Sequence, residues 1–149
     1  MDGSVRVTLN TATPRLREAA RRINNLRTPL SRSETYMERS IGNRFRSGSD
    51  WQRLSSTTIK WHPRRAGGKP LEDTGELRMS VTSGAVKRMS DKQLRIGTAL
   101  PKARLHQFGG RTKLGTFVPA RKFLYFDEKD ERMVKEIFDD YIEEVARDV

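Results

Sequence analysis

The chain has 149 residues, with 30 lysines and arginines against 19 aspartates and glutamates, a net charge of +11. Apolar residues make up 34% and charged residues 33% of the chain. So few apolar residues provide only a small hydrophobic core, and we expect part of the chain to become ordered only in an assembly. The lack of cysteine excludes disulfide scaffolds, thiolate zinc sites and cysteine nucleophiles. No apolar run approaches the roughly 18 residues of a membrane helix, and the start lacks a signal-peptide hydrophobic region. We therefore expect synthesis in the cytoplasm and no membrane partner.

The charge is unevenly divided along the chain. Residues 127–149 hold ten acidic and four basic side chains, a net charge of −6, so the first 126 residues carry +17. A basic body with an acidic end can pair within one molecule, or it can bind head to tail to copies of itself. The excess of lysine and arginine also makes nucleic acid the first candidate partner.

The length is typical of one domain, so we interpret residues 1–149 as a single unit. Apolar and polar side chains alternate over residues 5–9, which predicts an extended arm at residues 1–12. Thr13 and Pro14 are typical of a helix start, and apolar residues then recur at steps of three and four up to Leu26.

A second helical stripe begins at Thr28-Pro29 and ends near Gly48. Further along, glycines, prolines and three basic residues are combined at residues 63–70. This composition predicts a mobile, solvated loop over residues 62–72.

The second half of the chain predicts short strands and a long helix. Residues 74–77 are typical of a short helical turn, and residues 81–89 and 93–97 predict a hairpin. The dense apolar run at residues 117–126 is the predicted centre of a sheet. Asp127 is the predicted cap of an amphipathic final helix. Together these elements predict an α+β fold, with a small, mainly antiparallel sheet packed against N-terminal and C-terminal helices.

Candidate catalytic groups are scarce. Only His62 and His106 titrate near neutrality, and neither stands at a metal-ligand or acid-base spacing. We interpret His106 as structural, with one ring nitrogen bonded to a backbone carbonyl. The two Gly-Gly pairs match no phosphate-binding motif. We therefore expect no enzyme activity, no metal and no cofactor.

Five short motifs follow one another in an order that resembles the phage virion morphogenesis family. That group comprises the Mu-like neck and tail-completion proteins, which are also similar to siphophage neck proteins. The motifs are Trp51-Gln52-Arg53-Leu54 with Ser56-Thr57-Thr58 and Lys60; Leu71-Glu72-Asp73-Thr74-Gly75-Glu76-Leu77 with Ser80; Ile96-Gly97-Thr98; His106-Gln107-Phe108-Gly109; and Val118-Pro119-Ala120-Arg121-Lys122-Phe123-Leu124.

The resemblance implies a structural virion protein of the head–tail junction, acting in tail completion or as a tail terminator. Such a protein would form a ring of six or twelve copies, contact connector or stopper and tail-tube proteins, and let double-stranded DNA pass. The alternative is a non-specific DNA-binding protein that acts outside a ring, which the net charge alone favours.

Within the ring hypothesis, the residues divide into two groups. Arg64, Arg65 and Lys69 are candidates for the wall that faces DNA. Arg121 is a candidate for the subunit interface, because a charge inside an apolar run needs a partner or an exit to water. The acidic interface candidates are Asp139, Asp140, Glu143 and Glu144. We expect Gly75 and Gly97 to allow tight backbone geometry, and Phe108 and Phe123 to fill the core.

Overall fold

The computed structural model describes residues 14–48 and 51–148, so the predicted arm at residues 1–12 lies outside the described residues. Six helices, one short 3-10 helix and four strands follow one another along this part of the chain. They are α1 (Pro14–Asn24), α2 (Arg27–Ser47), α3 (Ser56–Trp61), η2 (Pro63–Arg65), α4 (Glu76–Ser80), β1 (Val86–Met89), β2 (Leu94–Gly97), α5 (Ala103–Phe108), β3 (Gly110–Arg111), β4 (Phe117–Val118) and α6 (Glu128–Arg147).

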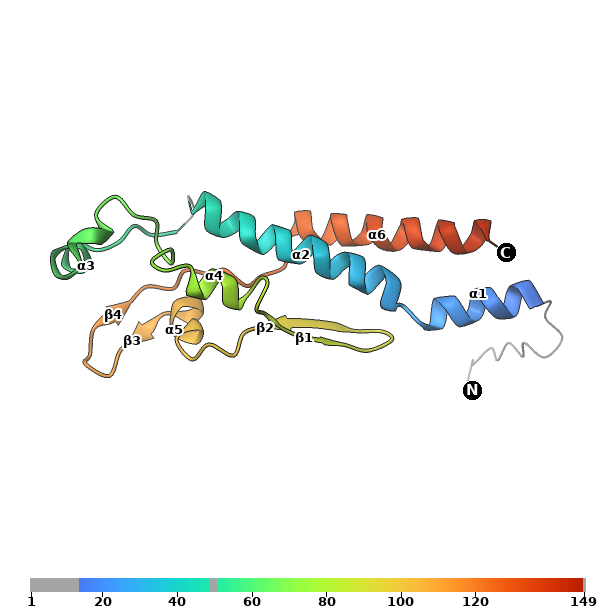
Figure 1. Ribbon diagram of the computed structural model, residues 1–149, viewed down its shortest axis with the longest axis horizontal. Coiled ribbons are helices and arrows are strands. Elements are labelled where there is room, and N and C mark those ends of the chain that lie inside the picture. The colour runs from blue at the N-terminus through green and yellow to red at the C-terminus, as the bar shows by residue number, and fades with distance from the viewer. Residues whose placement is uncertain (1–13, 49–50, 149) are drawn as a thin grey trace, which may run out of the picture.

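The molecule is elongated and is organised around α2 (Figure 1). α6 lies alongside α2 and runs in the opposite direction, while the β1–β2 hairpin contacts α2 from another side, so that α2 runs between them in Figure 1. α1 continues beyond the N-terminal end of α2 and lies near the C-terminal end of α6. At the far end of the molecule, α3 lies near β3 and β4.

The long helices agree with the sequence predictions. α1 begins at Pro14 as expected, and α2 begins at Arg27, close to the predicted start at Thr28-Pro29. Gly48 ends α2 with a φ of 56°, the left-handed conformation that glycine adopts without strain. Asp127 caps α6 by accepting a bond from the backbone N–H of Asp130 at 2.8 Å. Of the helices in the described residues, none is long and apolar enough to cross a bilayer.

The main core lies where α2, α4 and the segment after β4 meet. Phe45 and Phe123 are fully buried there, with ring centroids 5.7 Å apart, and Trp51 packs edge-on against Phe45 at 5.2 Å. Leu77 and Val81 bring α4 into the same cluster. The core therefore joins residues separated by about half the chain.

The α+β class is confirmed, with strands in two antiparallel hairpins, β1–β2 and β3–β4. The prediction that residues 117–126 form a sheet centre is wrong, because only Phe117 and Val118 are in a strand. Phe123 is buried in a segment without strand structure, and Tyr125 and Phe126 are exposed. Phe108 is also exposed, at 68%, so it does not fill the core as expected.

The β1–β2 hairpin forms within the predicted residues, but its first strand is shorter than predicted, because residues 81–85 are not in a strand. Its strands pair from Val86 with Gly97 to Met89 with Leu94. Val81 precedes the hairpin and caps the C-terminal end of α4. The prediction for Gly75 is confirmed by its φ of 81°. Gly97, in contrast, has no positive φ, and no atom of the described residues lies within 4 Å of the Cβ that another residue would place there.

Candidate functional site

A groove of about 720 Å³ lies between α3, α4 and the β3–β4 hairpin, and residues of four of the five motifs line it. Trp61, Leu114 and Phe117 are three large apolar side chains on its lining, and they remain 73%, 94% and 65% exposed. Isolated exposed apolar residues are ordinary, whereas a group of them around one hollow is typical of an interaction site. We call this hollow the motif groove.

Arg121 joins two motifs on the lining of the motif groove. Its side chain is 7% exposed, and it donates through Nε to the carbonyl of Gln52 at 2.7 Å and through Nη2 to that of Arg53 at 3.0 Å. Burial lowers the pKa of Arg121. Carbonyls of its own chain accept from this guanidinium, so its charge does not require a neighbouring molecule. Its place at a subunit interface stays a prediction.

Gln107 binds the apolar segment at residues 117–126, which the sequence predicts as the centre of a sheet. Its side-chain oxygen accepts bonds from the backbone N–H groups of Phe123 and Leu124, both at 3.0 Å, and its side-chain nitrogen donates to the carbonyl of Leu124 at 2.6 Å. One amide side chain thus replaces the strand neighbour that this segment lacks. Nearby, Gly109 has a φ of 72° and passes so close to Ala120 that a Cβ would lie 2.8 Å from its backbone nitrogen.

Further bonds join the remaining motifs. Trp51 donates from Nε1 to the carbonyl of Lys122 at 2.8 Å. The Thr98 hydroxyl donates to that of Ser80 at 3.0 Å, which links the residue after β2 to α4. Hydrogen bonds thus join the first, fourth and fifth motifs, mostly through the backbone, and a bond between two hydroxyls joins the second and third. Leu77, Ile96 and Phe123 pack these two groups into one core. The arrangement is a structural junction.

His106 lies between the motif groove and this junction. Burial lowers its pKa, and the neighbouring charges of Lys102 and Arg121 lower it further. Its Nδ1 atom is buried and has no hydrogen-bond partner in the described residues, so the expected bond from the ring to a carbonyl is absent there. The backbone carbonyl of His106 instead accepts a bond from the N–H of Arg121 at 2.8 Å.

The three DNA-facing candidates have different environments. Arg65 is buried and donates to the carbonyls of Glu72 at 2.7 Å and Lys69 at 2.9 Å, so its charge is used within residues 62–72. Arg64 is exposed and forms an ion pair with Asp73. Lys69 is exposed and donates to the carbonyl of Arg46 at the end of α2. These contacts hold the segment to itself and to α2, and its mobility in solution stays a prediction.

A second, polar hollow of about 470 Å³ lies between α2 and α4 and was not predicted from the sequence. Three arginines line it, Arg39, Arg46 and Arg78, of which Arg39 and Arg46 are exposed. Arg78 forms an ion pair with Glu72 at 3.3 Å. Arg39 and Arg46 lie on α2, whereas Arg78 lies on α4. The spacing of residues along one helix therefore could not predict that the three arginines come together.

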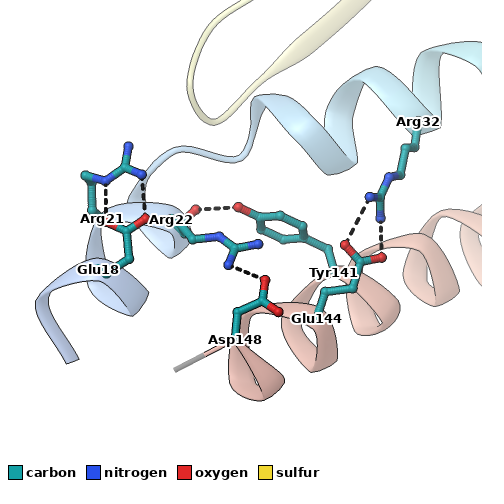
Figure 2. A network of polar contacts seen from close by, with 7 residues as sticks. All are labelled: Glu18, Arg21, Arg22, Arg32, Tyr141, Glu144 and Asp148. Atoms are coloured by element: carbon teal, nitrogen blue, oxygen red, sulfur yellow. Dashed lines mark hydrogen bonds and ion pairs between the residues drawn. The ribbon is translucent and has the colours of Figure 1, made fainter. Parts of the chain in front are cut away.

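The acidic candidates on α6 divide into two kinds. Glu144 accepts two bonds from Arg32 of α2, at 2.8 and 3.0 Å, and this pairing lowers the pKa of Glu144 and raises that of Arg32 (Figure 2). Asp139 pairs with Lys135 one turn earlier on the same helix. Asp140 and Glu143 are exposed and form no ion pair within residues 14–48 and 51–148. The acidic end is therefore partly neutralised by its own chain.

Figure 2 also shows how α1 is attached to α6. Arg22 of α1 pairs with Asp148 at 2.8 Å, and the hydroxyl of Tyr141 donates to the carbonyl of Arg22 at 3.0 Å. The Arg22 guanidinium lies 5.8 Å from the centroid of the Tyr141 ring. Part of the charge of the acidic end is thus paired with the basic body within one molecule, as one of the two sequence alternatives expected.

A buried polar cluster around Asp130 was missed by the sequence analysis. Asp130 is 1% exposed and accepts bonds from the hydroxyls of Ser40 at 2.7 Å and Tyr36 at 2.9 Å, while Arg44 forms an ion pair with it. Burial alone would raise the pKa of Asp130, but these bonds, the backbone N–H of Asp127 and the Arg44 charge lower it. The cluster joins α2 to α6.

Comparisons with known proteins give the identity of the family. The model of the phage virion morphogenesis family matches residues 7–143. Over 122 residues the chain is 33% identical to Mu-like prophage FluMu G protein 2 of Haemophilus influenzae, a match that covers 78% of this chain and 79% of that protein. No solved structure matches the chain. The resemblance inferred from the five motifs is confirmed, and the chain belongs to the phage virion morphogenesis family.

Proposed function

We propose that this virion morphogenesis protein is a non-catalytic building block that forms a ring at the head–tail junction of the particle. In this proposal it acts in tail completion or as a tail terminator, binds connector or stopper and tail-tube proteins, and surrounds the DNA. Six or twelve copies would form the ring. The protein would be made in the host cytoplasm and end in the virion.

The observation that carries the proposal is the motif groove. Its lining leaves Trp61, Leu114 and Phe117 largely exposed in the single chain. Covering such side chains is worth about 1.5–3 kcal/mol each, and large aromatic residues are the usual anchors of protein interfaces. The groove is therefore suited to hold a protein neighbour, as a ring component must.

Passage of DNA requires basic side chains that do not read sequence. Arg64, Arg65 and Lys69 stay our candidates for the channel wall: Arg64 and Lys69 supply exposed charge, and Arg65 braces the segment that carries them. Contacts to phosphates through lysine and arginine are independent of sequence, so the duplex can slide. Asp139, Asp140, Glu143, Glu144 and Arg121 stay our candidates for the subunit interface.

Electron microscopy of particles assembled without this protein tests the proposal. We expect heads and tails to accumulate separately, and to join when the protein is supplied afterwards. Particles with normally joined heads and tails in its absence would contradict the proposal. A variant with Trp61→Ser and Phe117→Ser should resemble the deletion, whereas Phe108→Ser, which changes an exposed aromatic residue outside the groove lining, should not.

A second candidate function is non-specific DNA binding outside a ring, which the arginine-lined hollow between α2 and α4 favours. If charge alone drives function, the purified chain should bind duplex DNA, with an affinity that falls steeply as salt rises. Arg39→Ala together with Arg46→Ala should then reduce the salt dependence. Normal joining of heads and tails in particles with that variant would separate this function from the ring.

A further inference from the structure

Two arginines stand opposite each other on the outer face of the β1–β2 hairpin. Arg88 and Arg95 are paired residues in the antiparallel register, and both are exposed. Like charges directly opposite each other destabilise a strand pair. Neither arginine forms an ion pair within the part of the chain that the structure describes. The hairpin therefore carries a repulsion that its own chain does not relieve.

The other face of the hairpin shows that this arginine pair points away from α2. Successive side chains of a strand point to opposite faces. Lys87, next to Arg88, reaches α2 and pairs with Glu34 at 3.3 Å and Glu38 at 3.2 Å. Ile96, next to Arg95, packs against the core. Because the inner face is directed at α2, the arginines are directed outwards.

α6 presents the opposite charge on its outer face. Glu136, Asp140 and Glu143 are spaced by four and three residues, so they follow one strip of the helix. All three are exposed, and none forms an ion pair in the described chain. Like charges four residues apart destabilise a helix. Tyr141 and Val145, which are buried, mark a different face of α6, so the acidic strip is directed away from the core.

We propose that the Arg88–Arg95 face of the hairpin binds the Glu136–Asp140–Glu143 strip of α6 in a second copy of this chain. α2 runs between the hairpin and α6 (Figure 1), so the two faces lie on different sides of one molecule. A contact between two different faces repeats from copy to copy and can close a ring. The inference rests on the proposed function and names the pair of surfaces that would build its ring.

The dimensions of the two surfaces agree with this pairing. The strip from Glu136 to Glu143 covers about 10 Å of helix, and two arginines on neighbouring strands can each meet a carboxylate in a two-bond arrangement. Each surface also has an exposed apolar side chain beside its charges, Val86 on the hairpin and Met133 on α6. Pairing would relieve the repulsion within each surface and cover both apolar groups.

Charge reversal in the full-length chain tests the contact. One variant carries Arg88→Glu and Arg95→Glu, a second carries Glu136→Lys and Glu143→Lys, and a third combines all four. Self-association of each purified protein is measured by sedimentation, with circular dichroism as the check on folding. We expect each reversed variant to self-associate at least about tenfold more weakly. The combined variant should recover, because the attraction is restored with the signs exchanged.

The control variant is Arg104→Glu with Lys122→Glu, which changes the net charge by the same amount as Arg88→Glu with Arg95→Glu, at two exposed positions outside both surfaces. It should associate like the unchanged chain, and added salt should weaken association of both. Unaltered self-association in the reversed variants, or no recovery in the combined variant, would overturn the contact. A loss of DNA binding with no loss of self-association would assign the arginines to phosphates, and would also overturn it.

The outcome is separable from that of the proposed function. Self-association of the purified chain scores the contact, whereas joining of heads to tails in particles scores the role in the virion. An unchanged chain that stays monomeric at its solubility limit would overturn the contact. A deletion that leaves heads and tails joined would overturn the role at the junction and leave a measured contact standing.

Discussion

Arg44 of α2 and Asp130 of α6 form a buried ion pair that sets the position of the two longest helices relative to each other. Arg44 also donates to the carbonyl of Phe123 at 3.1 Å, and its guanidinium lies 3.6 Å from the centroid of the Tyr125 ring. The same side chain thus contacts α6 and the segment that precedes it. Arg44 therefore connects the α2–α6 contact to the core around Phe123.

Replacing Asp130 should strongly destabilise the fold. Asp130→Ala leaves the Arg44 charge, together with the hydroxyls of Ser40 and Tyr36, without its acceptor, and we expect a loss of about 3–5 kcal/mol in the free energy of unfolding. Urea denaturation measures it. Glu131→Ala, one residue later and exposed, is the control and should cost less than about 0.5 kcal/mol. Equal effects of the two variants would contradict the role of the cluster.

Gln107 should matter through its backbone contacts. Gln107→Ala removes the partners of two N–H groups and one carbonyl, and we expect a loss of about 2–3 kcal/mol in unfolding free energy. Gln107→Glu keeps both acceptor bonds but places a carboxylate oxygen where the amide nitrogen donates to the Leu124 carbonyl, so it should also be less stable than the unchanged chain. Amide hydrogen exchange at Phe123 and Leu124 should accelerate in Gln107→Ala. Unchanged exchange there would show that other groups hold the segment.

Gly109 should tolerate no side chain. Its φ of 72° is strained for other residues, and a Cβ would lie 3.0 Å from the carbonyl oxygen of Val118 as well as close to Ala120. Gly109→Ala should cost at least about 2 kcal/mol in thermal or urea unfolding. Gly97→Ala is the matched control, because that position has an ordinary φ and open space. It should be neutral or slightly stabilising.

His106 should make stability depend on pH. Its pKa is lowered by burial and by Lys102 and Arg121, so the unfolded chain takes up the proton first as pH falls. The contribution is complete above about pH 6.5, the pKa of an unfolded histidine, and is lost as pH falls through the lower folded pKa. His106→Gln should flatten the decline in unfolding free energy between about pH 7 and 5.5.

Local signals explain which elements could be predicted. α6 follows from Asp127, the acids of its first turn and a regular apolar stripe, which are all determined within 20 residues. The β1–β2 hairpin follows equally from alternation and a short polar link. The apolar run at residues 117–126 lacks such a signal, because a short apolar stretch looks the same whether a strand or a side chain holds it. Its partner, Gln107, is 16 residues from Phe123.

The candidate site depends on tertiary contacts that the spacing of residues in the sequence does not predict. In the sequence, Asp130 is one of several acidic residues in the first turn of a helix. Only its hydrogen bonds with Ser40 and Tyr36 in the structure show that it belongs to a buried cluster. The sequence marks Arg121 as a charge in an apolar run, but its acceptors, the carbonyls of Gln52 and Arg53, lie almost seventy residues away along the chain. The family, in contrast, can be recognised from the order of the short motifs, because that order is visible in the sequence without knowledge of their contacts.

The central claim is that copies of this chain form a ring around DNA where head meets tail. A cryo-electron microscopy reconstruction of that junction in finished particles tests it most directly. We predict a closed ring into which the α2–α6 pair and the β1–β2 hairpin fit, with the duplex on its axis. A junction whose density is fully explained by other proteins, with this chain absent or present as isolated copies, would contradict the account.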